Sequence, residues 1–155
     1  MTINATETSV SSSTVVEVPV ERAFTAFTEE METWWDPKHH LIEIERMVVE
    51  PRVGGRIYDV GVDGSECQWS RVLAYEPPHR FVFSWDISVE WQIETDHSKT
   101  SEVEVRFIEE APSRTRVELE HRNLDRHDAG WEQMREAVGS GWRNLDDYAK
   151  AAEGR

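Results

Sequence analysis

The side chains of this sequence best suited to binding chemistry are large aromatic and apolar ones at regular spacing. They occupy alternate positions on the predicted strands and recur every three or four residues on the predicted C-terminal helix. Side chains of this kind line pockets that bind small apolar or amphipathic molecules. The alternative interpretation is that they form an ordinary, fully packed core. The candidate wall comprises Trp34, Trp35, Tyr58, Trp69, Trp85, Phe107, Trp131, Met134, Val138 and Trp142.

Trp34 and Trp35 stand where the first predicted helix meets the next segment. Core packing and a helix stop would explain both rings, and closure of a pocket mouth by one ring is the functional alternative. Neighbouring helical positions face different directions, so we expect the two rings to have different roles.

Two polar side chains could set the specificity of such a pocket. His121 shares the inward register of a predicted strand with Val117 and Leu119, so it could point at the pocket or be a structural histidine. Arg71 shares a strand face with Trp69 and could anchor an anion, and exposure at the strand edge is the alternative. No catalytic residue can be assigned from these patterns.

Sequence motifs for common catalytic and cofactor sites are missing. There is no Gly-x-Ser-x-Gly nucleophile elbow, P-loop, Gly-x-Gly-x-x-Gly fingerprint or His-Glu-x-x-His motif. The adjacent side chains of His39 and His40 diverge, and no cysteine or third histidine lies at ligand spacing. We therefore expect neither a metal nor a cofactor.

The balance of charges excludes two classes of partner. A formal net charge of −14 repels nucleic acid and anionic membrane surfaces, and no stretch approaches the roughly 18 apolar residues of a membrane span. Cys67 is the only cysteine, so no internal disulfide can form, which suits a reducing compartment. We expect a cytoplasmic protein that binds no nucleic acid and does not insert into a membrane.

The residue pattern predicts a strand, a helix, six further strands and a final long helix. Pro19 stops the first strand at 15–18, and helical spacing then runs from Val20 to Met31. One amphipathic helix is expected from about 128 to 152. The six strands are predicted at 42–50, 56–60, 66–75, 80–86, 102–108 and 114–121.

This order of elements predicts an α+β fold in a single domain. Strands grouped in sequence are joined as hairpins, so the sheet is expected to be antiparallel, with seven strands curved around the C-terminal helix. A sheet curved around one helix leaves room for an internal cavity. We expect residues 1–13 to form a flexible lead-in and 14–152 to form the domain.

Several short segments carry a family resemblance together with the element order β-α-β6-α. They are Trp34-Trp35-Asp36-Pro37, Pro51-Arg52-Val53-Gly54-Gly55-Arg56, Glu76-Pro77-Pro78-His79-Arg80 with the following Phe81-Val82-Phe83-Ser84-Trp85, Thr115 to His121, and Gly141-Trp142 with Leu145. In this order they resemble the START-like (SRPBCC, helix-grip) superfamily. Within it, the sequence is most similar to bacterial proteins related to the C-terminal domain of the activator of Hsp90 ATPase.

The resemblance implies a fold and a range of functions rather than one reaction. Its members bind lipids, hormones and polyketide-like rings, so it favours a binder of a small hydrophobic or amphipathic ligand. A cavity enzyme of the cyclase, dehydratase or hydrolase type is the first alternative. An Hsp90-interacting module linked to the stress response is the second, and a homodimer is compatible with each.

Overall fold

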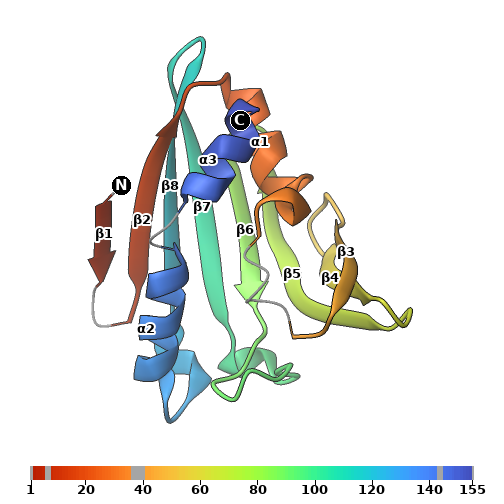
Figure 1. Ribbon diagram of the computed structural model, residues 1–155. Coiled ribbons are helices and arrows are strands. Elements are labelled where there is room, and N and C mark those ends of the chain that lie inside the picture. Colours follow the sequence, from red (N-terminus) through yellow and green to blue (C-terminus); the bar gives the residue numbers. More distant parts are fainter. Residues whose placement is uncertain (1, 6–7, 36–40, 143–144, 155) are drawn as a thin grey trace.

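The computed structural model describes residues 2–5, 8–35, 41–142 and 145–154. An antiparallel sheet in the order β1-β2-β8-β7-β6-β5-β4-β3 forms one layer, and three α-helices form the other (Figure 1). The strands are β1 (Thr2–Ala5), β2 (Val10–Val16), β3 (Ile44–Val49), β4 (Arg56–Gly61), β5 (Glu66–Glu76), β6 (Arg80–Trp85), β7 (Ser101–Ala111) and β8 (Arg114–Arg122). The helices are α1 (Val20–Thr28), α2 (Trp131–Trp142) and α3 (Asp146–Glu153), with 3-10 turns η1 (Met31–Thr33), η3 (His97–Lys99) and η4 (Leu124–His127).

The structure confirms the α+β class and the antiparallel helix-grip sheet. On β8, Thr115, Val117, Leu119 and His121 alternate with outward polar residues and are at most 2% exposed. This alternation arises because successive side chains on a strand point to opposite faces. The inward register predicted from the sequence is therefore present in the folded sheet.

The N-terminal edge of the sheet differs from the expectation. β2 begins at Val10, inside the segment expected as a lead-in, and pairs with β8 from Val10↔His121 to Val16↔Thr115. Thr2–Ala5 adds an eighth strand by pairing with β2. Ser11 to Thr14 form an unbroken run of small polar residues, so the strand has no period-2 hydrophobic pattern that would predict it. The flexibility of the lead-in stays a prediction.

The prediction of one continuous C-terminal helix is wrong, because the structure has two helices in this part of the chain. α2 ends at Trp142 and α3 begins at Asp146. Gly139 and Gly141 weaken the helix near this point, since glycine costs about 1 kcal/mol relative to alanine in a helix. The division lets α3 pack against α1 while α2 packs against η4 and β2.

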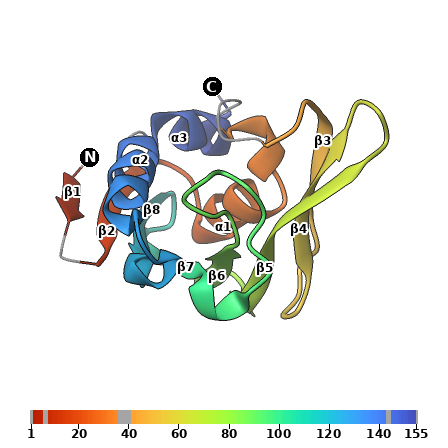
Figure 2. The same cartoon turned by 90° about the horizontal axis from the view of Figure 1, so that it is seen from below.

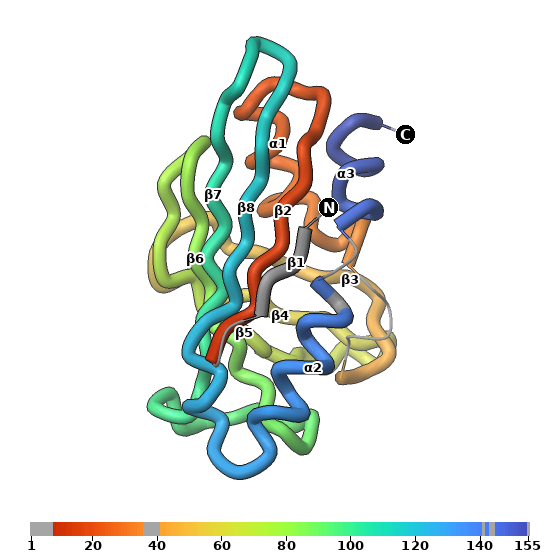
Figure 3. The backbone as a smooth tube through the Cα atoms, turned by 90° about the vertical axis from the view of Figure 1, so that its left-hand side faces the viewer, coloured from red at the N-terminus to blue at the C-terminus, as the bar shows by residue number. Residues whose placement is uncertain are grey.

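All three α-helices cover the same face of the sheet. Figure 2 shows α1, α2 and α3 on one side of the layer formed by β5, β6 and β7. The side view in Figure 3 separates α3, beside α1, from α2, which lies farther along the strands. No helix in the described ranges is long and apolar enough to cross a membrane.

Two aromatic groups pack between the sheet and the helices. The first, called the phenylalanine core, joins α1, α3 and the adjacent strands through ring centroids 5.2–6.5 Å apart. The second, called the tryptophan cluster, joins the segment that follows η1 to β5, β6 and α2. The core comprises Phe24, Phe27, Phe81, Phe83, Phe107 and Tyr148, and the cluster comprises Trp35, Trp69, Trp85 and Trp142.

Candidate functional site

The tryptophan cluster brings four distant parts of the chain together. Ring centroids lie 5.0 Å apart for Trp35–Trp69, 6.0 Å for Trp69–Trp85, 6.3 Å for Trp85–Trp142 and 5.6 Å for Trp142–Trp35. These distances are those of tilted and edge-to-face aromatic contacts. The four rings form a closed circuit of contacts, and each is at most 6% exposed.

Two of these indoles have a buried donor without an acceptor. The Nε1–H groups of Trp69 and Trp85 are shielded from solvent and have no hydrogen-bond partner in the part of the chain that the structure describes. Leaving a buried donor unpaired costs about 1–3 kcal/mol, so folded proteins rarely keep such groups. An oxygen atom of a bound molecule would relieve that cost.

A buried polar chain adjoins the cluster. The Nε1 atom of Trp142 donates to Nδ1 of His121 at 3.1 Å. The Oγ atom of Ser101 lies 2.7 Å from Nε2 of His121 and 2.7 Å from Nε2 of His127. Ser101 also pairs with Trp85 across β6 and β7, which places the polar chain at the edge of the aromatic rings. The chain joins α2, β8, β7 and η4.

Burial keeps both histidines of this chain uncharged near neutral pH. Loss of solvation lowers the pKa of His121 to about 3, and the neighbouring His127 adds to the effect. Burial also lowers the pKa of His127, against the opposing influence of Glu94 and Asp86. A neutral imidazole presents one donor and one acceptor, so each ring can act in a directed hydrogen bond.

The backbone around η4 holds His127 in place. Asn123 before this turn has φ 62°, and Asp128 after it has φ 67°. Left-handed conformations of non-glycine residues are uncommon, although asparagine and aspartate tolerate them best. Leu124 of the same turn is fully buried, and its N–H donates to Thr8 O at 3.0 Å. This anchoring fixes the turn that carries His127.

Arg71 is engaged by a buried carboxylate and is therefore a poor anchor for an anion. Its Nε and Nη2 atoms donate to the two carboxylate oxygens of Asp86 at 2.9 and 3.0 Å. Asp86 is 4% exposed, and Thr100 Oγ1 lies 3.3 Å from Nη2 of Arg71. The bidentate pair neutralises the guanidinium and fixes β5 to the end of β6.

An open pocket of about 600 Å³ lies on the outside of the tryptophan cluster. Trp35 lines this pocket and also contacts Trp69 and Trp142 inside the molecule. Its ring therefore separates solvent from the interior of the cluster. The pocket is lined by Glu30, Glu32, Thr33, Trp34, Trp35, Asp147, Lys150 and Ala151.

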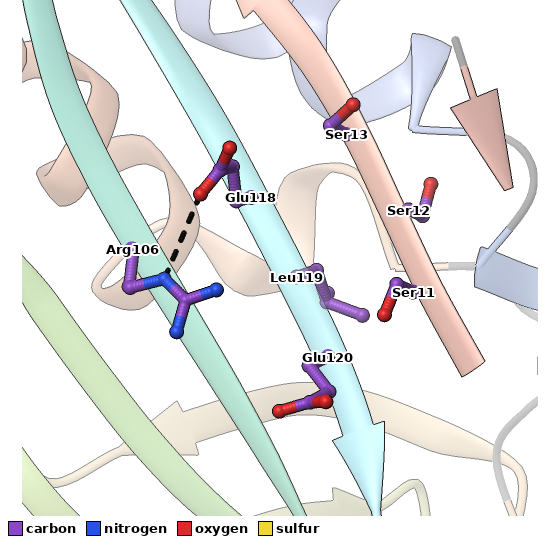
Figure 4. Close-up of a pocket in the computed structure, with 7 residues that line it drawn as sticks. All are labelled: Ser11, Ser12, Ser13, Arg106, Glu118, Leu119 and Glu120. Atoms are coloured by element: carbon purple, nitrogen blue, oxygen red, sulfur yellow. Dashed lines mark ion pairs between the residues drawn. The ribbon is translucent and has the colours of Figure 1, made fainter. Parts of the chain in front are cut away.

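A second, smaller depression lies over β2, β8 and β7 and is polar. Figure 4 shows Arg106 paired with Glu118, their charged atoms 3.7 Å apart, with serines of β2 beside them. Its volume is about 230 Å³, and it is lined by Ser11, Ser12, Ser13, Arg106, Glu118, Leu119 and Glu120. Hydroxyls and an exposed ion pair bind water well, so this depression lacks the apolar wall of a ligand site.

The structure brings part of the predicted wall together. Trp35, Trp69, Trp85, His121 and Trp142 are joined through ring contacts. Met134 and Val138 are each 3% exposed on α2. An enclosed cavity between sheet and helices stays a prediction, because the two pockets described above are open.

Other predicted wall residues lie elsewhere. Phe107 packs against Phe24 in the phenylalanine core, with centroids 5.2 Å apart. Trp34 points to the same core, where its Nε1 donates to Ala26 O at 2.8 Å. Trp34 and Trp35 contact each other and both line the outer pocket, but only Trp35 also contacts Trp69, and their expected difference in role stays a prediction.

Two aromatic side chains of the predicted wall lie under arginine side chains. The guanidinium of Arg56 sits 4.3 Å from the ring centre of Tyr58, and that of Arg135 sits 5.2 Å from the ring centre of Trp131. Tyr58 is half-buried next to the fully buried Ile57 and therefore projects to the opposite side of β4. Neither ring belongs to the tryptophan cluster.

Ser101 and His127 are site residues outside the set predicted from the sequence. Ser101 shares the inward register of Val103 and Val105, so the alternation on β7 could have revealed it. His127 lies in a 3-10 turn, where no periodic signal exists. Its position depends on the packing of η4 against α2.

Cys67 is the described cysteine, and its thiol is half-buried. Burial raises the pKa of the half-buried Cys67 thiol, with Asp59 adding to the effect, so the thiol stays protonated. His39 and His40 lie outside the described residues. Within the described ranges, no group of three or more His, Cys, Asp or Glu side chains is arranged to hold a metal ion.

Solved structures similar to this chain include one with a stated catalytic role. It is described as an anthrahydroquino-gamma-pyrone synthase, Txn09, solved in a complex. The two chains are 38% identical with a TM-score of 0.66, and the match covers 93% of this chain and 96% of that one. A comparison with curated proteins found no match.

Two other similar structures come from named bacteria. CalU16 from Micromonospora echinospora is 25% identical, with a TM-score of 0.58 and coverage of 94% of this chain and 71% of that one. Protein NE0264 from Nitrosomonas europaea is 16% identical, with a TM-score of 0.68 and 96% coverage of both chains, which shows the shared fold alone.

The family comparison covers almost the whole domain. The family described as Activator of Hsp90 ATPase homolog 1-like protein matches residues 17–150. The matched segment includes α1, strands β3 to β8, α2 and most of α3. The chain therefore belongs to the Activator of Hsp90 ATPase homolog 1-like family, within the START-like helix-grip superfamily.

Proposed function

We propose that this protein binds a small, flat, amphipathic aromatic molecule between the sheet and α2, against the tryptophan cluster. The observation that carries the proposal is the pair of buried, unpartnered Nε1–H groups of Trp69 and Trp85. Apolar ring faces would stack on the molecule, and the indole donors would bind its oxygen atoms. The molecule is thus apolar over most of its surface and carries a few polar acceptors.

Trp35 is the proposed gate to this site. Its ring lines the open outer pocket and contacts the inner rings, so its displacement would open the cluster to that pocket. The ligand would then replace the contacts that Trp35 makes with Trp69 and Trp142.

Calorimetric titration with anthracene-2-sulfonate tests the proposal. We expect micromolar binding to the wild-type protein and at least roughly tenfold weaker binding to Trp69→Leu, because stacking area in the cluster is lost. Trp131→Leu is the matched control, since Trp131 packs against Arg135 outside the cluster and its loss should leave the affinity unchanged. Absence of binding, or equal losses in both variants, would refute the interior site.

A cyclase-type activity at the same site is the second candidate. The observation that favours it is the 38% identity to a chain described as a pyrone synthase, combined with the buried His121, Ser101 and His127. Such groups can polarise a carbonyl during ring closure. An ortho-hydroxyaryl 1,3-diketone that closes to a γ-pyrone and releases one water is a suitable probe. Acceleration that disappears in Ser101→Ala would support the activity, and an unchanged background rate would exclude it for this substrate class.

Four other expectations about partners, cellular role and location stay predictions. They are binding to an Hsp90-type chaperone, a link to the stress response, homodimer formation and a cytoplasmic location. Co-purification with the middle domain of the chaperone would test the first of these directly.

A further inference from the structure

The hydrogen-bond chain beside the tryptophan cluster has a fixed direction. It begins at the indole nitrogen of Trp142, which can only donate. Its acceptor is Nδ1 of His121, at 3.1 Å. Since His121 is uncharged, its single ring proton must then sit on Nε2.

The same reasoning carries the direction through Ser101 to His127. The Nε2–H of His121 donates to Ser101 Oγ, and the Ser101 hydroxyl then donates to Nε2 of His127. With Nε2 accepting, the proton of neutral His127 sits on Nδ1. If the proton of His127 sat on Nε2 instead, the Ser101 hydroxyl hydrogen would have no acceptor and Nδ1 of His127 would have no donor. With the proton on Nδ1, only that Nδ1–H group is unpaired.

The end of the chain is a buried donor without an acceptor. His127 is 5% exposed, and its Nδ1 atom has no hydrogen-bond partner in the described structure. The two carboxylates that influence it are engaged elsewhere. Asp86 accepts from Arg71 through both oxygens, and Glu94 accepts from the backbone N–H of Asp96 at 3.1 Å.

We infer that Trp142, His121 and Ser101 form a one-way hydrogen-bond relay that presents Nδ1–H of His127 as a fixed neutral donor for a carbonyl or enolate oxygen of the bound molecule. This inference rests on the proposed function and names the ligand class, an aromatic ketone or quinone. Trp142, His121 and Ser101 are positioning residues, and His127 is the residue that touches the ligand. The relay donates a hydrogen bond and transfers no proton.

The three unpartnered ring nitrogens near the site agree with this ligand class. Trp69 Nε1–H, Trp85 Nε1–H and His127 Nδ1–H are all donors. A hydrocarbon would leave each of them unpaired, and a ligand rich in N–H groups would offer them no acceptor. Carbonyl oxygens on a flat ring system satisfy these donors, and an enolate formed on such a ring would be stabilised most.

The tautomers test the relay without any ligand. Long-range proton–nitrogen NMR of the histidine rings at pH 7 should show His121 with its proton on Nε2 and His127 with its proton on Nδ1. In Trp142→Phe, the donor to His121 is lost, so a mixture of tautomers at His121 is expected. The opposite tautomer at either histidine in the wild-type protein would overturn the inference.

A matched pair of probes tests the ligand class. Anthraquinone-2-sulfonate and anthracene-2-sulfonate share three flat rings and one sulfonate, and they differ in two carbonyl oxygens. Calorimetry should show at least roughly tenfold tighter binding of the quinone to the wild-type protein. His127→Phe should reduce this preference several-fold and keep the affinity for anthracene-2-sulfonate, because only the indole donors then remain for the carbonyl oxygens. His127→Asn, whose amide N–H replaces Nδ1–H, should retain most of the preference.

The outcomes separate the inference from the proposed function. Equal affinity of both probes for the wild-type protein would overturn the donor role of His127 and leave the aromatic site intact. Binding of neither probe would overturn both. A quinone preference that is as large in His127→Phe as in the wild-type protein would also refute the role assigned to His127.

Discussion

The phenylalanine core and the tryptophan cluster are both aromatic and buried, yet they differ in how their polar groups are satisfied. In the core region, Tyr148 donates its hydroxyl to Ala23 O at 2.8 Å, and Trp34 donates to Ala26 O at 2.8 Å. In the cluster, the indole donors of Trp69 and Trp85 have no acceptor among the described residues. A region optimised for stability pairs its buried donors, so the unpaired donors of the cluster point to binding.

The pattern of contacts supports the same division. Phe27 is fully buried and has ring contacts with Trp34, Phe81, Phe83, Phe107 and Tyr148. Trp35 of the cluster stands instead between the inner rings and an open pocket. The core region thus fixes the helices on the sheet, and the cluster is the part of the interior that borders the open pocket through Trp35.

The largest expected effect comes from breaking the phenylalanine core. Phe27→Ala should lower the free energy of unfolding by about 3–5 kcal/mol, because it removes a fully buried ring and leaves a cavity. Urea denaturation monitored by circular dichroism measures this loss. Phe27→Leu is the control of smaller volume change. A loss below about 1 kcal/mol in Phe27→Ala would contradict the structural role of the core.

The second effect is a loss of stability in acid that originates beside the cluster. The pKa of His121 is about 3 in the folded protein and about 6.5 when unfolded, so below pH 6.5 only the unfolded chain takes up this proton. Stability should therefore fall as pH falls, by about 2.5 kcal/mol between pH 6.5 and 4.5. Carboxylates such as Glu104 add to the loss in the lower part of this window, because Arg80 and Arg122 lower its folded pKa against the opposing effect of burial, while its unfolded form titrates near pH 4.5.

Urea denaturation at several pH values measures the acid effect. His121→Gln removes the buried imidazole, so the free energy of unfolding should fall less steeply between pH 6.5 and 4.5. His97→Gln, which removes an exposed histidine of η3, is the matched control. An unchanged slope in His121→Gln would show that other groups cause the acid loss.

A matched pair of tryptophan substitutions tests whether buried indole N–H groups are paired beside the phenylalanine core and unpaired in the tryptophan cluster. Trp34→Phe and Trp69→Phe make the same change at buried positions, but only Trp34 loses a hydrogen bond. Trp34→Phe should therefore cost about 1 kcal/mol more in the free energy of unfolding. Equal costs, measured by urea denaturation, would mean that the two indole N–H groups are equally satisfied and would remove the contrast between the regions.

The smallest expected effect is a gain of stability in α2. A Cβ atom at Gly139 would lie 3.5 Å from the two methyl groups of Val10, which is an ordinary contact. Gly139→Ala should therefore stabilise the protein by about 0.5–1 kcal/mol through helix propensity. Thermal unfolding measures the gain, and Ala137→Gly in the same helix should show a loss of similar size. Destabilisation by Gly139→Ala would show that α2 must approach β2 more closely.

The strands and the inward register were largely predictable from the sequence. Alternation on β7 and β8 placed Val103, Val105, Val117 and His121 inside, because side-chain direction on a strand has a period of two. The division between α2 and α3 was not predictable, since the apolar stripe continues through Leu145 and Ala149 without a change in period. The helix ends depend on packing against α1 and β2, which a single sequence pattern does not describe.

The candidate site was predictable only as a set of large aromatic residues with one inward histidine. The sequence by itself determined which faces of the strands are apolar and that His121 lies among them, because these are local properties of periodicity. Only the tertiary structure decided that Trp142, Ser101 and His127 meet His121, since the four residues lie on four different elements. Hydrogen bonds need the donor and acceptor within about 3 Å, and that distance is set by how the elements pack.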